Sequence, residues 1–188
     1  MKKFIILLFV ILLSNAVFAT DLSQGKEYYK SLIKSQYITY NTTGLVYSIK
    51  KKNNDVTEYF MKSGFDPNST YFGFPVTFYA ITVDNMDSLE ILLKNGANPD
   101  SVSMGGTLLI WAIYNKNTKA VNIIINNSAD VNKDYMDTIP LNEAIIFNNA
   151  EITKMLLNAG ANADEKTQKL INKSKNGDIK KLFSDTDI

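Results

Sequence analysis

Apolar residues recur at intervals of three and four along four short segments, a spacing that places them on one side of an α-helix. Each segment ends at a glycine or a serine, namely Gly64, Gly96, Ser128 and Gly160, and these positions are 32 residues apart. The stripes consist of Val56, Tyr59 and Phe60; Leu89, Leu92 and Leu93; Val121, Ile124 and Ile125; and Ile152, Leu156 and Leu157. A fixed interval over four segments predicts a repeat protein.

A shorter apolar segment precedes each stripe, so that each unit contains two helices. The shorter segments carry a small residue at the same interval: Ser48, Ala80, Ala112 and Ala144. An asparagine separates the two helices of every unit: Asn53, Asn85, Asn117 and Asn149. Asparagine tolerates left-handed backbone angles, so we predict that these residues turn the chain between the helices. Thr107 is predicted as an N-cap and Pro75 and Pro140 as first helical residues. Gly96 and Gly160 are predicted as C-caps.

The units resemble ankyrin repeats. "TLLIWAI" with "NNSADVN" and "IPLNEAI" with "NAGANAD" follow the pattern of that family. The resemblance implies an all-α solenoid in which helix pairs stack and short β-turn fingers project. We assign four repeats, with equivalent positions 32 residues apart, to 43–164. The family's helix-start histidine is replaced by Phe78, Ile110 and Asn142, which implies the loss of a hydrogen bond at each position.

The two ends of a solenoid need caps that cover an apolar face. We predict an N-terminal capping helix within 20–42 and a C-terminal capping half-repeat over 165–188, with a turn at Asn176 and Gly177. Residues 1–19 combine a basic start, the apolar stretch Phe4–Leu13 and a small residue, Ala19, at the end. That order predicts a cleaved signal peptide, although an uncleaved anchor is the alternative. The expected location is therefore the periplasm or the exterior.

Composition removes several classes of function. The chain contains no histidine and no cysteine, which excludes histidine-dependent triads, disulfides and histidine-ligated metal sites. The formal net charge is +1, so charge gives no argument for nucleic-acid binding. We expect no cofactor, no metal and no stable membrane insertion after cleavage of the signal peptide. We expect a monomer.

The resemblance implies a partner protein bound by the first helices and the finger tips, on the concave face of the stack. The residue before the small one forms a ladder at the repeat interval: Tyr47, Tyr79, Trp111 and Glu143. The ends of the first helices add Thr82, Val83, Tyr114, Asn115, Ile146 and Phe147, and the finger tips add Tyr71, Phe72, Met104, Tyr135 and Met136. Aromatic residues and methionine favour protein interfaces. Stacking between repeats is the alternative role for these rings, and a solvated helix end is the interpretation of Lys50, Lys51 and Lys52.

The leading hypothesis is a non-enzymatic binding protein of the cell envelope, such as an inhibitor or immunity partner of an envelope-acting toxin or a companion of a periplasmic enzyme. A secreted effector that binds host proteins is the second hypothesis. An enzyme is the third hypothesis. Motifs for phosphate binding and for a nucleophile are absent from the sequence, so catalysis would require a pair of acidic residues.

Overall fold

The computed structural model describes residue 31, residues 40–103 and residues 105–184. The chain divides into two units, Met1–Tyr40 and Asn41–Ile188, and the second unit contains the helix pairs. The predicted signal peptide lies outside the described residues. So does almost all of the predicted N-terminal capping helix.

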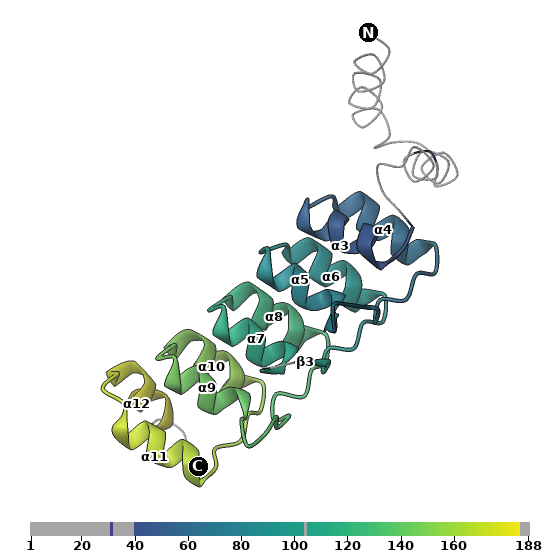
Figure 1. The fold of residues 1–188 in the computed structure, drawn as a ribbon. Coiled ribbons are helices and arrows are strands. Elements are labelled where there is room, and N and C mark those ends of the chain that lie inside the picture. Colours follow the sequence, from purple (N-terminus) through teal and green to yellow (C-terminus); the bar gives the residue numbers. More distant parts are fainter. Residues whose placement is uncertain (1–30, 32–39, 104, 185–188) are drawn as a thin grey trace. The chain divides into compact units, whose positions relative to one another are not determined.

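Helix pairs follow one another along the second unit (Figure 1). The first helices of the pairs are α3 (Thr42–Lys50), α5 (Val76–Thr82), α7 (Leu108–Tyr114), α9 (Pro140–Ile146) and α11 (Glu165–Lys173). The second helices are α4 (Asn54–Lys62), α6 (Met86–Lys94), α8 (Thr118–Asn126), α10 (Ala150–Asn158) and α12 (Gly177–Ser184). First helices pack on first helices and second helices on second helices, which forms two parallel rows. The predicted all-α solenoid is confirmed.

Short hairpins project between the pairs. Strand β1 (Thr70–Tyr71) pairs antiparallel with β2 (Phe74–Pro75), and β3 (Val102–Ser103) pairs antiparallel with β4 (Gly106–Thr107). The third finger has no assigned strand, but the backbones of Tyr135 and Thr138 exchange two hydrogen bonds of 3.0 Å. Backbone pairing thus closes three fingers in the described part of the chain, each shortly before the following first helix.

The asparagines between the helices act differently from the sequence prediction. Asn53, Asn85, Asn117 and Asn149 all have negative φ angles, between −106° and −87°. Each is the N-cap of the second helix, and its side chain accepts a hydrogen bond from the backbone N–H three residues later. The left-handed residue is the one before each asparagine: Lys52, Asp84, Lys116 and Asn148. The prediction of left-handed asparagines is thus wrong, because the amide is used as a helix cap.

The other predicted helix ends agree more closely with the structure. The hydroxyl of Thr107 accepts from the N–H of Ile110 as an N-cap, and Pro140 is the first residue of α9. Pro75 is instead the N-cap of α5, one residue earlier than predicted. The C-caps of α6 and α10 are Asn95 and Ala159, and the predicted glycines, Gly96 and Gly160, follow them directly with left-handed φ angles of 93° and 89°.

The core lies between the two rows of helices. Buried side chains include Leu45, Phe60, Leu89, Leu92, Ile110, Ile124, Ile152 and Leu156, each 0% exposed. Phe78 and Ile110, which stand where the resembled family has histidine, join this apolar core. Two of the three substitutions therefore exchange a polar contact for buried apolar surface.

Asn142, the third substitution, keeps a polar contact and uses it to hold the last helix pair. Its side chain is buried and accepts a hydrogen bond of 2.6 Å from the hydroxyl of Thr167 on α11. Thr167 also forms a reciprocal capping box with Asp164, the N-cap of α11. The backbone and side-chain hydrogen bonds from Thr167 hold the pKa of the Asp164 carboxyl below its usual range. A buried polar network thus joins α9 to α11.

Side-chain amides connect the base of one finger to the next. Asn68 donates to the carbonyl of Gly96 and accepts from the N–H of Asn98, at 3.0 and 2.7 Å. Asn132, two repeats after Asn68, makes the same pair of hydrogen bonds with Gly160 and Asn162. The position between them holds Asp100, which accepts from the N–H of Asp130 at 2.9 Å. The carbonyl equivalent to those of Gly96 and Gly160 is that of Ser128. An ionised carboxylate has no proton to donate to it.

We expect Asp100→Asn to raise the free energy of unfolding by about 0.5–1.5 kcal/mol, the net value of one added hydrogen bond. The amide would reproduce the pattern of Asn68 and Asn132. Chemical denaturation followed by circular dichroism measures the change. The reverse substitution, Asn132→Asp, is the matched control and should lower stability. A loss of stability in Asp100→Asn would contradict this account of the finger bases.

Candidate protein-binding surface

A continuous row of aromatic rings follows the first helices and the first finger. Neighbouring ring centroids in this row are 4.5–6.5 Å apart and most pairs meet edge to face. We call this set the aromatic row: Tyr71, Phe72, Phe74, Tyr79, Trp111, Tyr114 and Phe147. Six of the seven are site residues predicted from the sequence. Their contacts also bear out the alternative reading, since rings of neighbouring repeats stack on one another.

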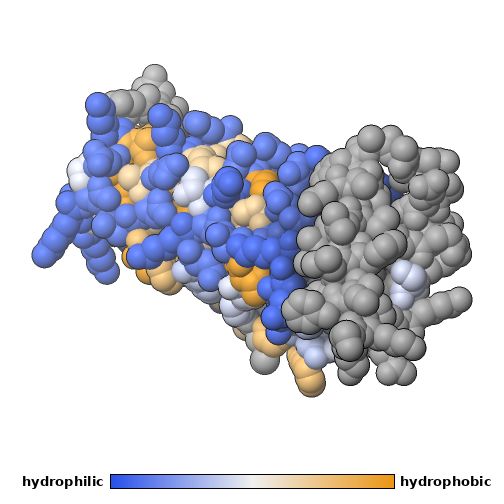
Figure 2. Space-filling model, turned by 90° about the horizontal axis from the view of Figure 1, so that it is seen from above, coloured by the Kyte–Doolittle hydropathy of each residue, from blue (hydrophilic) through white to orange (hydrophobic). Residues whose placement is uncertain are grey.

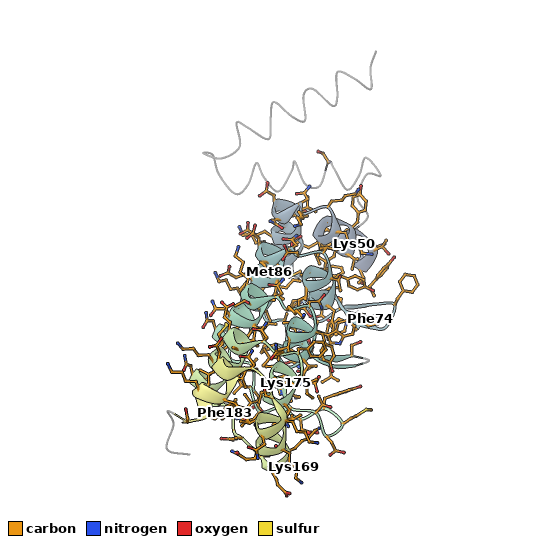
Figure 3. All side chains as sticks on the ribbon, turned by 90° about the vertical axis from the view of Figure 1, so that its left-hand side faces the viewer. Lys50, Phe74, Met86, Lys169, Lys175 and Phe183 are labelled. Carbon is orange, nitrogen blue, oxygen red and sulfur yellow. The ribbon has the colours of Figure 1, made fainter. Side chains whose placement is uncertain are left out.

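Phe74 was not among the predicted residues, yet it links the two central members of the row. Its ring lies 6.4 Å from Tyr79 and 6.3 Å from Trp111. Figure 3 places Phe74 on the hairpin side of the stack, on the same side as Lys50 and away from Met86. The missed signal was the "YFGFP" segment, in which a two-residue turn puts Tyr71 and Phe74 opposite each other.

The finger tips present large apolar side chains to solvent. Phe72 is 83% exposed and Met136 is 80% exposed, and both have left-handed backbone angles, with φ of 49° and 51°. Left-handed backbone angles are strained for bulky residues, and strain of this kind is frequent at functional sites. Met104 stands at the same repeat position as Phe72 and Met136 but lies outside the described residues. The tips therefore keep apolar side chains at a backbone position that suits glycine or asparagine.

Trp111 is the centre of the row and the only tryptophan of the chain. Its indole packs on Phe78 at 5.5 Å and lies against the turn at Gly105, where an added Cβ would be 3.6 Å from the ring. The indole N–H is buried and has no hydrogen-bond partner among the described residues. A buried donor of this kind is costly to leave unpaired.

The hydroxyl of Tyr79 fixes the first finger to its helix. It donates a hydrogen bond of 2.6 Å to the carbonyl of Tyr71, and burial, followed by the nearby Tyr71, raises the pKa of the Tyr79 phenol. Lys50 lies over the Tyr79 ring, with Nζ 5.0 Å from the centroid, and Lys51 lies 5.7 Å from the centroid of Tyr47. These exposed lysines thus contact aromatic faces, where the sequence had indicated only a solvated helix end.

At the other end of the row the charge is negative. Burial raises the pKa of the Tyr114 phenol, and the neighbouring carboxylate of Glu143 raises it further. Glu143 is half-buried, and the described residues place no lysine within ion-pair distance of it. The two ends of the row therefore differ in charge as well as in sequence.

The remaining predicted residues lie around the row. Tyr47 and Ile146 are 48% and 50% exposed. Val83 and Tyr135 are half-buried, while Thr82 and Asn115 are exposed and hydrogen-bond to backbone carbonyls of their own helices. Figure 2 shows a mostly hydrophilic surface with separate hydrophobic patches. The exposed apolar members are Tyr47, Phe72, Met136, Ile146 and Phe147.

Within the described residues, acidic side chains nowhere gather in a group of three that could hold a metal ion. In the same part of the chain, none of the helices is both long enough and apolar enough to cross a membrane.

Comparison with known families agrees with the geometry. Residues 77–167 match the family model described as ankyrin repeats in three copies. A search of curated proteins found no match. With the stacked helix pairs and projecting fingers, this match identifies the fold as an all-α ankyrin-repeat solenoid. Ankyrin repeats indicate a protein–protein interaction module, and the family generally consists of non-enzymatic binding scaffolds.

Proposed function

We propose that this protein binds one partner protein through the aromatic row and the apolar finger tips, without catalysing a reaction. The observation that supports this most is Phe72, which is 83% exposed at a left-handed turn position. Neither solvation nor backbone geometry favours a phenylalanine there, so a contact outside the chain is the best reason for it.

The row has the character of an interface centre. Large rings that are already held by their neighbours lose little conformational freedom on binding, so their buried area contributes efficiently to affinity. Phe74 and Trp111 form an edge-to-face pair, and the hydroxyl of Tyr79 anchors the hairpin that carries Phe72. Binding would therefore require little rearrangement of the site.

We further propose an exported location, in the periplasm or outside the cell, on the basis of the basic, apolar and small-residue order of residues 1–19. An envelope protein such as a toxin or a periplasmic enzyme is then the first class of partner. A host protein bound by a secreted effector is the second. Fractionation of producing cells separates these, since an effector accumulates in the medium.

The test is an affinity capture with the tagged full chain on envelope fractions and on culture medium. We expect Tyr79→Ala with Trp111→Ala to abolish capture of the specific partner, because two central rings are lost. Tyr59→Ala, on the second helix α4, is the control and should capture normally. Circular dichroism confirms that each variant is folded.

Phe72→Asn provides a variant that separates binding from stability. Asparagine accepts left-handed angles, so the fold should be as stable as the wild type or slightly more so. Capture should nevertheless weaken, because the exposed ring is gone. Equal capture by wild type, Phe72→Asn and the double alanine variant would refute the aromatic row as the binding surface.

A further inference from the structure

Two equivalent positions of the repeat hold a charged residue and an aromatic residue at both ends of the aromatic row, but in the opposite order and with the opposite sign of charge. Lys50 and Tyr79 meet across the boundary of the first two repeats, where the lysine lies over the ring at 5.0 Å. Two repeat intervals later, the same two positions hold Tyr114 and Glu143. At the first boundary the chain supplies both a cation and the ring it covers. At the third boundary it supplies a ring and an anion.

The geometry around Tyr114 suits a positive charge. Its ring lies 5.2 Å from Phe147 at an angle of 47° and 6.5 Å from Trp111 at 62°. Glu143 and Phe147 are one helical turn apart, and the N–H of Phe147 donates to the carbonyl of Glu143 at 2.8 Å. Side chains four residues apart share one helix face, so carboxylate and ring border the same space. Aromatic faces and carboxylates both attract cations.

Glu143 hydrogen-bonds to the Tyr114 side chain, but no ion pair in the described part of the chain balances its charge. The ion pairs found there join Lys62 to Glu58, Lys94 to Glu90 and Lys169 to Glu165, all on other helices. Glu143 is half-buried, which weakens its hydration and increases the gain from a partner charge. Of the two first helices that pack on α9, α7 contains no charged residue, so the surface toward Trp111 is apolar, whereas α11 carries Glu165, Lys166, Lys169 and Lys173.

We propose that the partner places one arginine or lysine side chain on the rings of Tyr114 and Phe147 and pairs it with Glu143. The proposal rests on the proposed function, since it specifies what binds at one end of the aromatic row. The neighbouring partner residues are apolar, to match Trp111 and Phe74. The site thus recognises a protein segment with a basic residue beside apolar ones.

The test begins with a random peptide library without tryptophan, displayed and selected on the full chain. Peptides are kept if they bind wild type and fail to bind Tyr79→Ala with Trp111→Ala. We expect these peptides to share an arginine or lysine next to apolar residues. A synthetic member of the set is then titrated against each variant. The fluorescence of Trp111, the only tryptophan in the chain, reports binding at the row.

Glu143→Gln should lower the affinity for this peptide about tenfold or more, the usual effect of a lost charged hydrogen bond. Glu151→Gln, which removes the same charge from an exposed site on α10, is the matched control and should change affinity less than about twofold. The Glu143→Lys variant should lose affinity for the peptide. A second peptide, in which glutamate replaces the basic residue, should bind that variant again. Circular dichroism establishes that both Glu143 variants are folded.

The outcomes separate the two proposals. Peptides that need Tyr79 and Trp111 but share no basic residue, or that bind Glu143→Gln as well as Glu151→Gln, would overturn the cation site and leave the proposed function intact. Failure to select any peptide that depends on Tyr79 and Trp111 would count against the proposed function itself, and the cation site would fall with it.

Discussion

Replacing Leu156 by alanine is expected to lower the free energy of unfolding by about 2–5 kcal/mol. Leu156 is 0% exposed on α10, which packs against α8, α9 and α12. Truncation would remove apolar contacts and leave a cavity between helices whose positions are fixed by neighbours on both sides. Chemical denaturation, followed in parallel by circular dichroism and Trp111 fluorescence, measures the loss.

Leu157→Ala is the matched control, because Leu157 is adjacent on α10 but half-buried. It should lose less stability, in proportion to its smaller buried area. The two probes also report on coupling between repeats. Because a solenoid is stabilised by contacts between neighbouring units, the Leu156 variant could unfold its last two helix pairs separately, which would appear as non-coincident transitions. Equal losses for both variants would contradict the placement of Leu156, and not Leu157, on the buried face of α10.

Gly106→Ala is the second substitution with a large expected effect, about 2–6 kcal/mol of destabilisation. An added Cβ would lie 2.6 Å from Cγ2 and 2.9 Å from Cβ of Ile110, which is itself 0% exposed and branched at Cβ. Overpacking of this kind costs roughly 1–3 kcal/mol. The φ of 151° adds a strain of roughly 1–3 kcal/mol for any other residue.

Gly105→Ala separates these two contributions. Gly105 also has a positive φ, 101°, but an added Cβ there would be 3.6 Å from the nearest side-chain atom, an ordinary contact. It should therefore show only the backbone part of the cost. Thermal unfolding of both variants beside the wild type gives the comparison. A Gly106→Ala variant no less stable than Gly105→Ala would exclude overpacking against Ile110.

The repeat architecture was predictable because it depends on positions that recur at a constant interval. The period of 32 residues, the stripe that contains Leu156 and the cap at Thr107 all depend on local sequence, and the structure agrees with each. The prediction for the asparagines between the helices was wrong because asparagine serves two different local functions. Asn53 and its equivalents could either adopt left-handed angles or cap a helix, and sequence alone does not distinguish these.

The candidate site was less predictable, since its members meet through contacts between repeats. Phe74 lies outside the ladder of first-helix residues, and only the hairpin register brings its ring between Tyr79 and Trp111. Lys50 was interpreted as solvated because its aromatic partner is in the next repeat. The isolation of Glu143 likewise depends on where the lysines of other helices lie.

The arrangement of contacts between neighbouring pairs has a consequence for how the chain acquires its structure. In the described part of the chain, each helix packs on its own partner or on the neighbouring pair in sequence, so the parts of the chain that meet are close in sequence. Low sequence separation between contacting residues favours fast folding. Two adjacent pairs can therefore nucleate structure, and the remaining pairs can add to either side in succession.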